Sequence, residues 1–468
     1  MMNIEKANRP VAIALDLGST SFKLGILDES GKLEIAFEVP SPELRGTGLI
    51  REGDPEEFLS AATRLLDRAA HRWPGLPLGL VSQRSTFTVW NRASGQPMVP
   101  MISWQDRRAA DWCAAHPELE EAVRNRAGLL LSPHYVGPKL AALQGETPEI
   151  ANALNDGEAL IGTLDAWMIW HWSQSNSHRT DLTMAARTAL ADIERGDWSS
   201  ELSGLFEVAV TALPGILPTD SQAMRLRNGL QLNANIADQA SGAIAVLDPA
   251  EDVALVNFGT GAFVLYPQAA RGVRKAGYLT APVLATADGG LRFVLEGTIN
   301  GAGPALDRFD SGPTELPTAD SCADGFAIPD LAGIGSPHWR EDIDLTLSAA
   351  AMSSPPAIQR RIVLEGLLFR VLEILFDLGD ARLPDRVLIS GGLVRDPAIG
   401  LGLACLLNRP VEQLIEPETT LLGAARLAAG FNPFAHPATR IISPTNAGTY
   451  LAEKYGRWRD WFRELLVE

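Results

Sequence analysis

The sequence has few cysteines, and none are spaced as in a disulfide framework. Its 468 residues contain only Cys113, Cys322 and Cys405, which are far apart and include no CxxC pair. Such a sparse, odd-numbered set is typical of reduced thiols in a cytosolic protein. Residues 1–10 lack the apolar core of a signal peptide. We therefore expect a cytoplasmic protein.

Long hydrophobic runs and an excess of positive charge are both missing. The most apolar stretch, residues 362–376, is interrupted by Glu365, Arg370 and Glu373, which excludes a membrane-spanning segment. Lys and Arg total 40 against 57 Asp and Glu, which gives a formal net charge of −17. Because such a surface repels polyanions, neither nucleic acid nor an anionic membrane is an expected partner.

Two common catalytic motifs are also absent. The chain has no HExxH zinc motif and no GxxxxGK[ST] phosphate loop, and its seven histidines form no cluster with metal-ligand spacing. The composition is nevertheless that of a folded protein, with 46% hydrophobic and 21% charged residues. Its length predicts two or three domains, each with a packed core.

The first part of the chain has the pattern of an antiparallel meander. Residues 11–17 form a nearly continuous apolar run, and residues 22–27 and 33–39 read as two further strands. Residues 28–31 have the composition of a hairpin turn between them. Residues 56–72 then show the spacing of apolar side chains that is typical of an amphipathic helix.

The second half begins in the same way. Residues 252–258 and 262–266 read as strands around a tight turn at 259–261. A third strand is expected at 291–295, leading through 296–298 into a glycine-rich helix start.

The strand–turn–strand pattern therefore occurs twice, about half a chain apart. Gly18 and Gly259 stand at equivalent places in the two turns. This repetition predicts duplication, with a cleft between two similar domains. Alternating helices and strands are then expected at residues 361–378, 386–390, 399–407, 410–411 and 420–429.

The turn DLGSTS at residues 16–21 is a candidate phosphate site. Its glycine and hydroxyl residues offer backbone N–H groups and side chains to phosphate oxygens, and Asp16 is suited to hold Mg²⁺ directly or through water. An ordinary hairpin turn favours the same residues. The second turn, at 259–261, favours the phosphate interpretation, because two such turns can clamp a polyphosphate across a cleft. Glycines at 391–392 and at 423 permit close approach either of a flat ligand or of packed backbone.

An ordered set of blocks resembles the FGGY carbohydrate kinase family, and most closely its glycerol kinase branch. In chain order they are ALDLGSTSFKLGILD, SQRSTFTVWNRASGQPMVPMISWQDRRAA, KLAAL, DQASGA, NFGTGAFVL, EGTINGAGPALDRF, IPDLAGIGSPHW, SGGLVRDPAIGLGLACLLNRPV and TTLLGAARLAAG. The resemblance implies an α/β fold of two ribonuclease H-like, actin-like ATPase domains with an interdomain cleft. It also implies a sugar-binding domain over residues 1–249 and a nucleotide-binding domain over 250–468, ATP and Mg²⁺ as cofactors, and a small sugar or polyol as substrate. It leaves a homodimer open.

The resemblance also implies a role for each matching residue. Asp238 corresponds to the catalytic base, and Asp16 to the Mg²⁺-associated aspartate. The implied sugar contacts are Arg84, Ser85, Trp104, His134, Asp238 and Gln239. The implied phosphate and nucleotide contacts are Gly18, Ser19, Thr20, Ser21, Lys23, Gly259, Thr260, Gly303, Asp307, Gly392 and Asp396.

Departures from the family pattern concentrate in the sugar pocket. Ser85 stands where glycerol kinases have a glutamate, and His134 where they have a tyrosine, unless the register slips and Tyr135 takes that place. These changes predict a longer polyol or a ketose as substrate. The alternatives are a true glycerol kinase and a catalytically silent nucleotide-binding regulatory protein on the same fold. Other departures are Lys23 in place of arginine, Asp307 and Asp396 in place of amides, and Ala141 in place of tryptophan.

Overall fold

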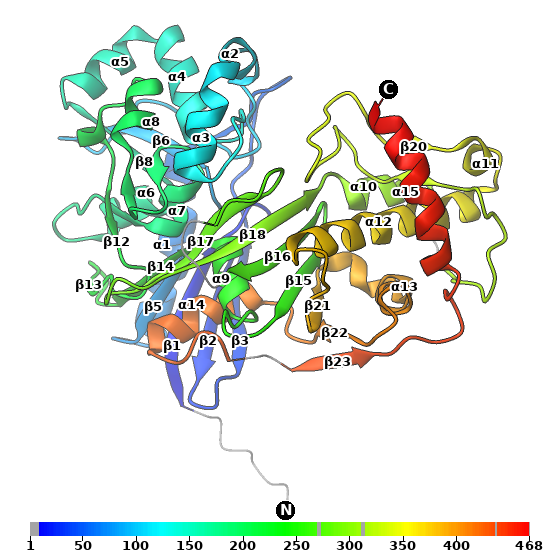
Figure 1. The fold of residues 1–468 in the computed structure, drawn as a ribbon. Coiled ribbons are helices and arrows are strands. Elements are labelled where there is room, and N and C mark those ends of the chain that lie inside the picture. Colours follow the sequence, from blue (N-terminus) through cyan, green and yellow to red (C-terminus); the bar gives the residue numbers. More distant parts are fainter. Residues whose placement is uncertain (1–8, 269–272, 310–313, 436–437, 468) are drawn as a thin grey trace, which may run out of the picture.

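Two α/β lobes lie side by side in the computed structural model (Figure 1). The structure describes residues 9–268, 273–309, 314–435 and 438–467. We call the lobe built on the sheet of β1 the N-terminal lobe, and the lobe built on the sheet of β15 the C-terminal lobe.

The N-terminal sheet brings three strand ends to one edge. Its order is β13-β14-β5-β1-β2-β3. Strand β1 pairs antiparallel with β2 and parallel with β5, which in turn pairs parallel with β14. Because Leu17, Ser82 and Ala237 lie level in these pairings, the residues that follow β1, β5 and β14 meet at the same edge. The strands are β1 (Pro10–Leu17), β2 (Ser21–Asp28), β3 (Leu33–Pro40), β5 (Pro77–Ser82), β13 (Met224–Arg225) and β14 (Gln231–Ala237).

The C-terminal sheet repeats this arrangement. Its order is β17-β18-β16-β15-β21-β22-β23. The series β18-β16-β15-β21-β22 has two antiparallel pairings followed by two parallel ones, as has the series β3-β2-β1-β5-β14. The predicted duplication is therefore confirmed in the topology. The strands are β15 (Val253–Phe258), β16 (Ala262–Gln268), β17 (Leu279–Ala285), β18 (Leu291–Ile299), β21 (Arg386–Ser390), β22 (Val411–Leu414) and β23 (Thr439–Ile442).

One part of the C-terminal sheet differs from the sequence expectation. Strand β17 was not predicted, and β18 runs on to Ile299 instead of ending at residue 295. Residues 296–298 are therefore strand, not the start of a helix. The reason lies at Gly297, where a Cβ atom would stand 2.4 Å from the side chain of Ile374 on a packed helix. Here the glycine permits close packing of a helix on the strand.

Helix α14 joins the two lobes. It belongs to the C-terminal half of the chain but packs on β1, β5 and α9. At Gly423 a Cβ atom would lie 2.1 Å from the carbonyl oxygen of Ser241, so this glycine permits close packing of backbone. A shared core results, with Ile236 from one lobe and Leu255 from the other in the same buried cluster. The long helices outside the small-sheet part of the N-terminal lobe are α1 (Pro55–Arg72), α12 (Pro356–Leu378), α13 (Pro397–Leu407), α14 (Thr419–Ala429) and α15 (Leu451–Val467).

A smaller sheet, β4-β7-β6-β8, extends the N-terminal lobe. Helices lie around this sheet (Figure 1). Its elements are β4 (Glu52–Gly53), β6 (Phe87–Asn91), β7 (Met101–Ile102), β8 (Ala159–Thr163), α2 (Ala110–Ala115), α3 (Glu120–Ala127), α4 (Val136–Glu146), α5 (Pro148–Asn155) and α6 (Leu164–Trp172). Short elements complete the chain: β9 (Arg179–Asp181), α7 (Leu182–Ala185), β10 (Ala191–Asp192), β11 (Asp197–Trp198), α8 (Ser200–Leu205), β12 (Gly215–Leu217), α9 (Asp238–Ile244), α10 (Ala302–Asp307), β19 (Ala327–Ile328), β20 (Thr346–Leu347) and α11 (Ala349–Met352).

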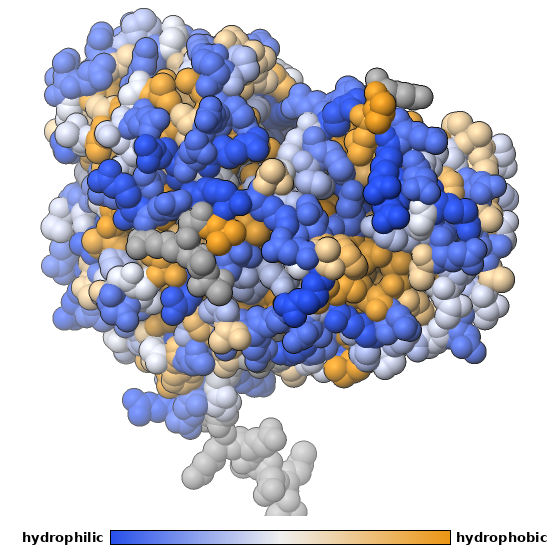
Figure 2. Space-filling view, in the orientation of Figure 1, coloured by the Kyte–Doolittle hydropathy of each residue, from blue (hydrophilic) through white to orange (hydrophobic). Residues whose placement is uncertain are grey.

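Two sequence expectations can be checked on the folded chain. The three cysteines are free thiols, as predicted. Among the helices of the described residues, none combines the length and apolar character needed to cross a bilayer. The face of the molecule in Figure 2 is mostly hydrophilic, with smaller hydrophobic patches between the hydrophilic residues.

Candidate active site

The first phosphate turn follows β1 and carries an unsatisfied carboxylate. Asp16 lies opposite Lys23 in the β1–β2 pairing, and Lys23 Nζ is 2.7 Å from Glu418 Oε1, just before α14. The Oδ1 atom of Asp16 is shielded from solvent and accepts no hydrogen bond in the described part of the chain. Burial, together with the negative charges of Asp238 and Glu418, raises the pKa of Asp16 to about 7 against the opposing effect of Lys23.

This carboxylate fits a magnesium ion. Mg²⁺ in phosphoryl-transfer sites is held by one or two carboxylates together with substrate phosphates and water. Asp16 offers a free, desolvated oxygen for which a cation would be a favourable partner. The described residues contain no ready-made group of three or more His, Cys, Asp or Glu ligands.

The turn itself leaves two hydroxyl residues exposed. Ser19 and Thr20 are exposed, whereas the Ser21 hydroxyl donates to Glu38 at 2.7 Å. The carbonyl of Gly18 accepts a 2.6 Å bond from the hydroxyl of Ser41, which holds the turn in place. Ser19 and Thr20 are thus the residues of this turn that are free to meet phosphate oxygens.

The second phosphate turn is tied to the start of α10. The Gly259 N–H donates to the Gly261 carbonyl at 2.9 Å, and the Gly303 N–H donates to the Thr260 carbonyl at 3.0 Å. Three of the predicted nucleotide contacts, Gly259, Thr260 and Gly303, are therefore brought together. Asp307 lies exposed at the other end of α10.

The glycine pair after β21 lies beside the second turn. Gly391 has φ +97°, and a Cβ atom on it would stand 2.3 Å from the Phe258 carbonyl oxygen. Gly392 is exposed, with open space where a side chain would project. Asp396, by contrast, caps α13 by accepting from the Ala398 N–H at 3.1 Å, and it lies 3.6 Å from Arg360. Gly392 is thus open to a ligand, while the Asp396 carboxylate is already engaged.

Asp238 stands at the edge where β5 and β14 end, and Arg84 holds it there. Arg84 Nε is 3.3 Å from Asp238 Oδ1, which also accepts the Gln239 N–H at 2.7 Å. Arg84 Nη1 donates to Gln239 Oε1 at 2.5 Å. The side chain of Asp238 remains 38% exposed, so it is open to a substrate. Three of the predicted sugar contacts form one hydrogen-bonded group.

Two residues of the site were missed by the sequence reasoning. The buried guanidinium of Arg187 forms an ion pair with Glu296, and its Nη2 atom also donates to Gln239 at 3.3 Å. Glu296 Oε2 lies 3.9 Å from Arg84 Nη1. Glu296 belongs to β18, so its carboxylate bridges the two lobes beside Asp238. The available signal was Glu296 itself, a carboxylate that interrupts an apolar stretch. A buried carboxylate is almost always paired, so a partner could have been expected.

Ser85 and His134 turn away from this group of charges. Ser85 is 5% exposed, and its hydroxyl donates to the Arg187 carbonyl at 2.6 Å. His134 Nδ1 lies 3.2 Å from the Trp104 carbonyl oxygen. The hydroxyl of Tyr135 instead bonds to the side chain of Arg187, and burial raises its pKa. Of the two neighbours, Tyr135 is therefore the one whose side chain lies with Arg187 and Arg84.

Hydrogen bonds fix the backbone that carries the exposed Trp104 side chain. This side chain is 39% exposed, so it is not part of the core. The backbone N–H of Trp104 donates to the Thr86 hydroxyl at 3.1 Å, and the fully buried Lys139 donates to the preceding Ser103 carbonyl at 2.7 Å. Burial lowers the pKa of Lys139 to about 7. An exposed indole on such a support is suited to pack against the apolar face of a sugar.

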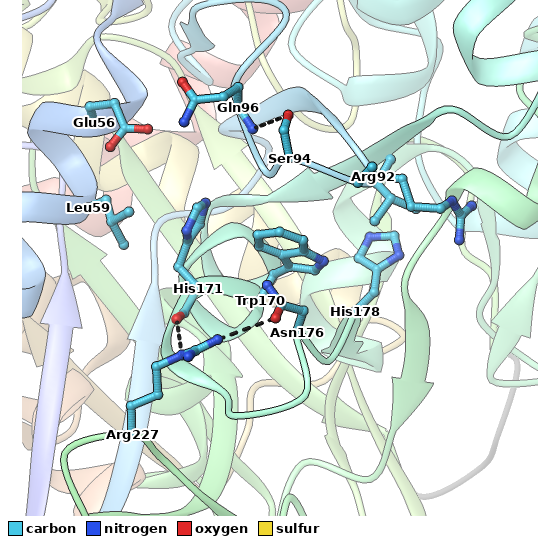
Figure 3. A pocket seen from close by; sticks show the side chains of 12 residues that line it. Glu56, Leu59, Arg92, Ser94, Gln96, Trp170, His171, Asn176, His178 and Arg227 are labelled. Atoms are coloured by element: carbon cyan, nitrogen blue, oxygen red, sulfur yellow. Dashed lines mark hydrogen bonds between the residues drawn. The ribbon is translucent and has the colours of Figure 1, made fainter.

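A cavity of about 720 Å³ lies elsewhere in the N-terminal lobe (Figure 3). Arg92, Trp170, His171, His178 and Arg227 are among its lining residues, and none of the predicted site residues is. Its guanidinium groups already donate to backbone carbonyls, at 2.7 Å for Arg92 and 3.0 Å for Arg227. The titratable groups suited to phosphoryl transfer are instead at the edges of the two central sheets.

Comparison with known proteins agrees with this geometry. The N-terminal domain model of the FGGY family of carbohydrate kinases matches residues 11–259, and the C-terminal domain model matches residues 254–430. The chain is 29% identical to the apulose kinase of Pectobacterium atrosepticum, over 96% of this chain and 97% of that protein. It is 28% identical to a glycerol kinase of Alkalilimnicola ehrlichii, over 96% of each chain.

Solved structures share the fold. The glycerol kinase of Plasmodium falciparum with ADP has a TM-score of 0.82 at 19% identity, over 98% of this chain and 99% of that one. The xylulose kinase of Rhodospirillum rubrum has a TM-score of 0.80 at 19% identity, over 98% of this chain and 99% of that one. The predicted architecture of two actin-like ATPase domains is confirmed.

Proposed function

The chain belongs to the FGGY family of carbohydrate kinases, and we propose that it transfers the γ-phosphoryl group of ATP to a sugar or polyol hydroxyl with Asp238 as the base. The observation that carries this proposal is the position of Asp238. It stands at the end of β14, is fixed by Arg84, and is electrostatically coupled to Asp16 at the first phosphate turn. A sugar hydroxyl beside Asp238 would therefore lie close to a phosphate at that turn.

The residues divide the work as phosphoryl transfer requires. Asp238 accepts the proton of the substrate hydroxyl while that oxygen attacks the γ-phosphorus and the bond to the bridging oxygen of ADP breaks. Arg84 and Gln239 keep the carboxylate oriented. The turns at Ser19 and at Thr260 offer N–H and hydroxyl groups to the phosphates. Mg²⁺, when held at Asp16, would neutralise phosphate charge.

The remaining features of the protein are proposed on the same basis. We place the domain division at residues 249 and 250, because Val253 starts the second copy of the sheet. Three free thiols support a cytoplasmic location. A silent regulatory protein is disfavoured, because the base, the metal-binding carboxylate and both phosphate turns are all present.

We expect a longer polyol or a ketose to be preferred over glycerol. The hydroxyl of Ser85 donates to the Arg187 carbonyl, and the Glu296 carboxylate is paired with Arg84 and Arg187, so neither side chain replaces the missing glutamate as an acceptor for two adjacent substrate hydroxyls. Losing a charged acceptor costs about 1.5–3 kcal/mol, or roughly ten- to a hundredfold in affinity. Glycerol has few other contacts with which to offset this loss. A longer substrate can also reach Tyr135 and Trp104.

The test is a ranking of kcat/KM for glycerol, erythritol, xylulose and ribulose, with coupled detection of ADP. A wide lead for glycerol would contradict the substrate prediction and leave the kinase assignment in place. A wider panel of polyols, ketopentoses and ketohexoses tests the assignment itself. ATP binding by calorimetry with no phosphorylated product from any sugar would favour the silent alternative.

A further inference from the structure

A buried carboxylate behind the site connects three separate segments. Asp181 is fully buried between β9 and α7, and it lines neither phosphate turn. Its oxygens accept the backbone N–H groups of Thr183 at 3.1 Å and Met184 at 3.0 Å. They also accept the hydroxyl of Thr183 at 2.9 Å and that of Thr219 at 2.9 Å. Four donors thus converge on one side chain.

The first threonine reaches the proposed base. The Thr183 hydroxyl accepts the N–H of Ala237 at 2.8 Å. Ala237 ends β14 and is the residue immediately before Asp238. Thr183 and Ala237 are both buried, so no solvent competes for this bond. The path from Asp181 to the backbone that carries Asp238 therefore contains only one intervening side chain.

The second threonine reaches the C-terminal lobe in the same way. The Thr219 hydroxyl accepts the N–H of Ala285 at 3.1 Å, and the Thr219 N–H donates to the Ala285 carbonyl at 2.7 Å. Ala285 ends β17, a strand of the C-terminal sheet. One carboxylate is thus linked to the base on one side and to the opposite lobe on the other.

The directions of these bonds favour the ionised form of the Asp181 carboxylate. Each threonine hydroxyl already accepts a backbone N–H, so it uses its single proton toward Asp181. Two O–H and two N–H donors therefore stabilise the charged form of Asp181, which accepts all four bonds. Burial and the nearby Asp165 raise the pKa of Asp181 to about 7, against the lowering effect of these donors. A buried carboxylate whose hydrogen bonds are all satisfied holds the segments around it rigidly.

We propose that Asp181 and Thr183 are positioning residues for Asp238, and that Thr219 ties the same support to strand β17 of the opposite lobe. This inference rests on the proposed function, because it takes Asp238 as the base. Asp181 does not touch the substrate. It acts by fixing the backbone from which the base projects, where a small displacement is costly to phosphoryl transfer.

The test compares Thr183→Val with Thr183→Ser. Valine keeps the shape of the side chain but removes the acceptor of the Ala237 N–H, whereas serine keeps the hydroxyl. We expect T183V to lower kcat about 10- to 100-fold with the KM for ATP unchanged, and T183S to stay close to wild type. Each substitution is repeated in a D238N background. If Thr183 acts through Asp238, T183V has little further effect there.

Each outcome decides between the alternatives. Equal activity of T183V, T183S and wild type, with D238N inactive, would overturn the positioning role and leave the proposed function standing. An equal loss from T183V in both backgrounds would also overturn it, because a general structural defect adds independently. Full activity of D238N would instead overturn the proposed function. If T183V does not fold, Thr183→Ala, which leaves room for a water molecule, replaces it in the same cycle.

Discussion

Asp238→Asn is expected to lower kcat at least about 10²-fold while ATP affinity stays nearly unchanged. Asparagine keeps the size of the side chain and one oxygen for Arg84 Nε and the Gln239 N–H, which bond to Asp238 Oδ1. It cannot take a proton from the substrate hydroxyl. Because the proposed nucleotide contacts do not include Asp238, we expect the loss to fall on the chemical step.

The measurement is steady-state turnover with the best substrate of the panel, together with ATP binding by calorimetry. Asp156→Asn is the matched control, because Asp156 is an exposed carboxylate at the end of α5. We expect it to behave as wild type. Turnover of D238N within a fewfold of wild type would remove Asp238 from the mechanism. An equal loss of ATP binding would show that the substitution disturbs the whole cleft.

The strands of the central sheets could be predicted because their signal is local. Residues 11–17, 22–27 and 33–39 correspond to β1, β2 and β3, and each predicted end is within one residue of the observed one. Residues 386–390 match β21 at both ends. Apolar runs bounded by turn residues determine such strands without reference to the rest of the chain.

The site could be predicted only where a residue stands in a recognisable block. Asp16, Arg84 and Asp238 were identified in this way, and the structure gathers them at one sheet edge. The pair of Arg187 and Glu296 was missed because it joins residues 109 positions apart, and no local pattern shows that these two side chains meet. The orientation of Tyr135 was likewise undetermined, since it depends on how α4 starts and not on composition.

Asp16→Asn is expected to lower turnover with Mg²⁺ and ATP by about 10²-fold or more, because the carboxylate that fits the metal is lost. The same substitution is expected to stabilise the protein without ligands. The folded-state pKa of Asp16 is about 7, against an ordinary value of 3.8, so folding favours its protonated form. A carboxyl group with a raised pKa contributes stability at low pH that is lost as the pH rises through the folded value.

The difference in unfolding free energy between D16N and wild type should therefore depend on pH in a defined direction. Below about pH 4 the two proteins are expected to match, since Asp16 is then protonated in both folded and unfolded states. The gap should widen between about pH 4 and pH 7 and level off above it, at no more than about 4 kcal/mol. Urea unfolding at pH 5 and pH 8 measures it, provided that both transitions are two-state.

Magnesium should stabilise the wild-type protein more at high pH than at low pH, and this pH dependence should be lost in D16N. Because Mg²⁺ competes with a proton for the shielded oxygen of Asp16, the rise in Tm from Mg²⁺ and ADP over ADP alone should be larger at pH 8 than at pH 6. In D16N the rise should be small at both values. A stability gap of the same size at pH 5 and pH 8 would contradict the raised pKa. A full magnesium effect in D16N would place the metal on other groups, and the loss of turnover would then need another cause.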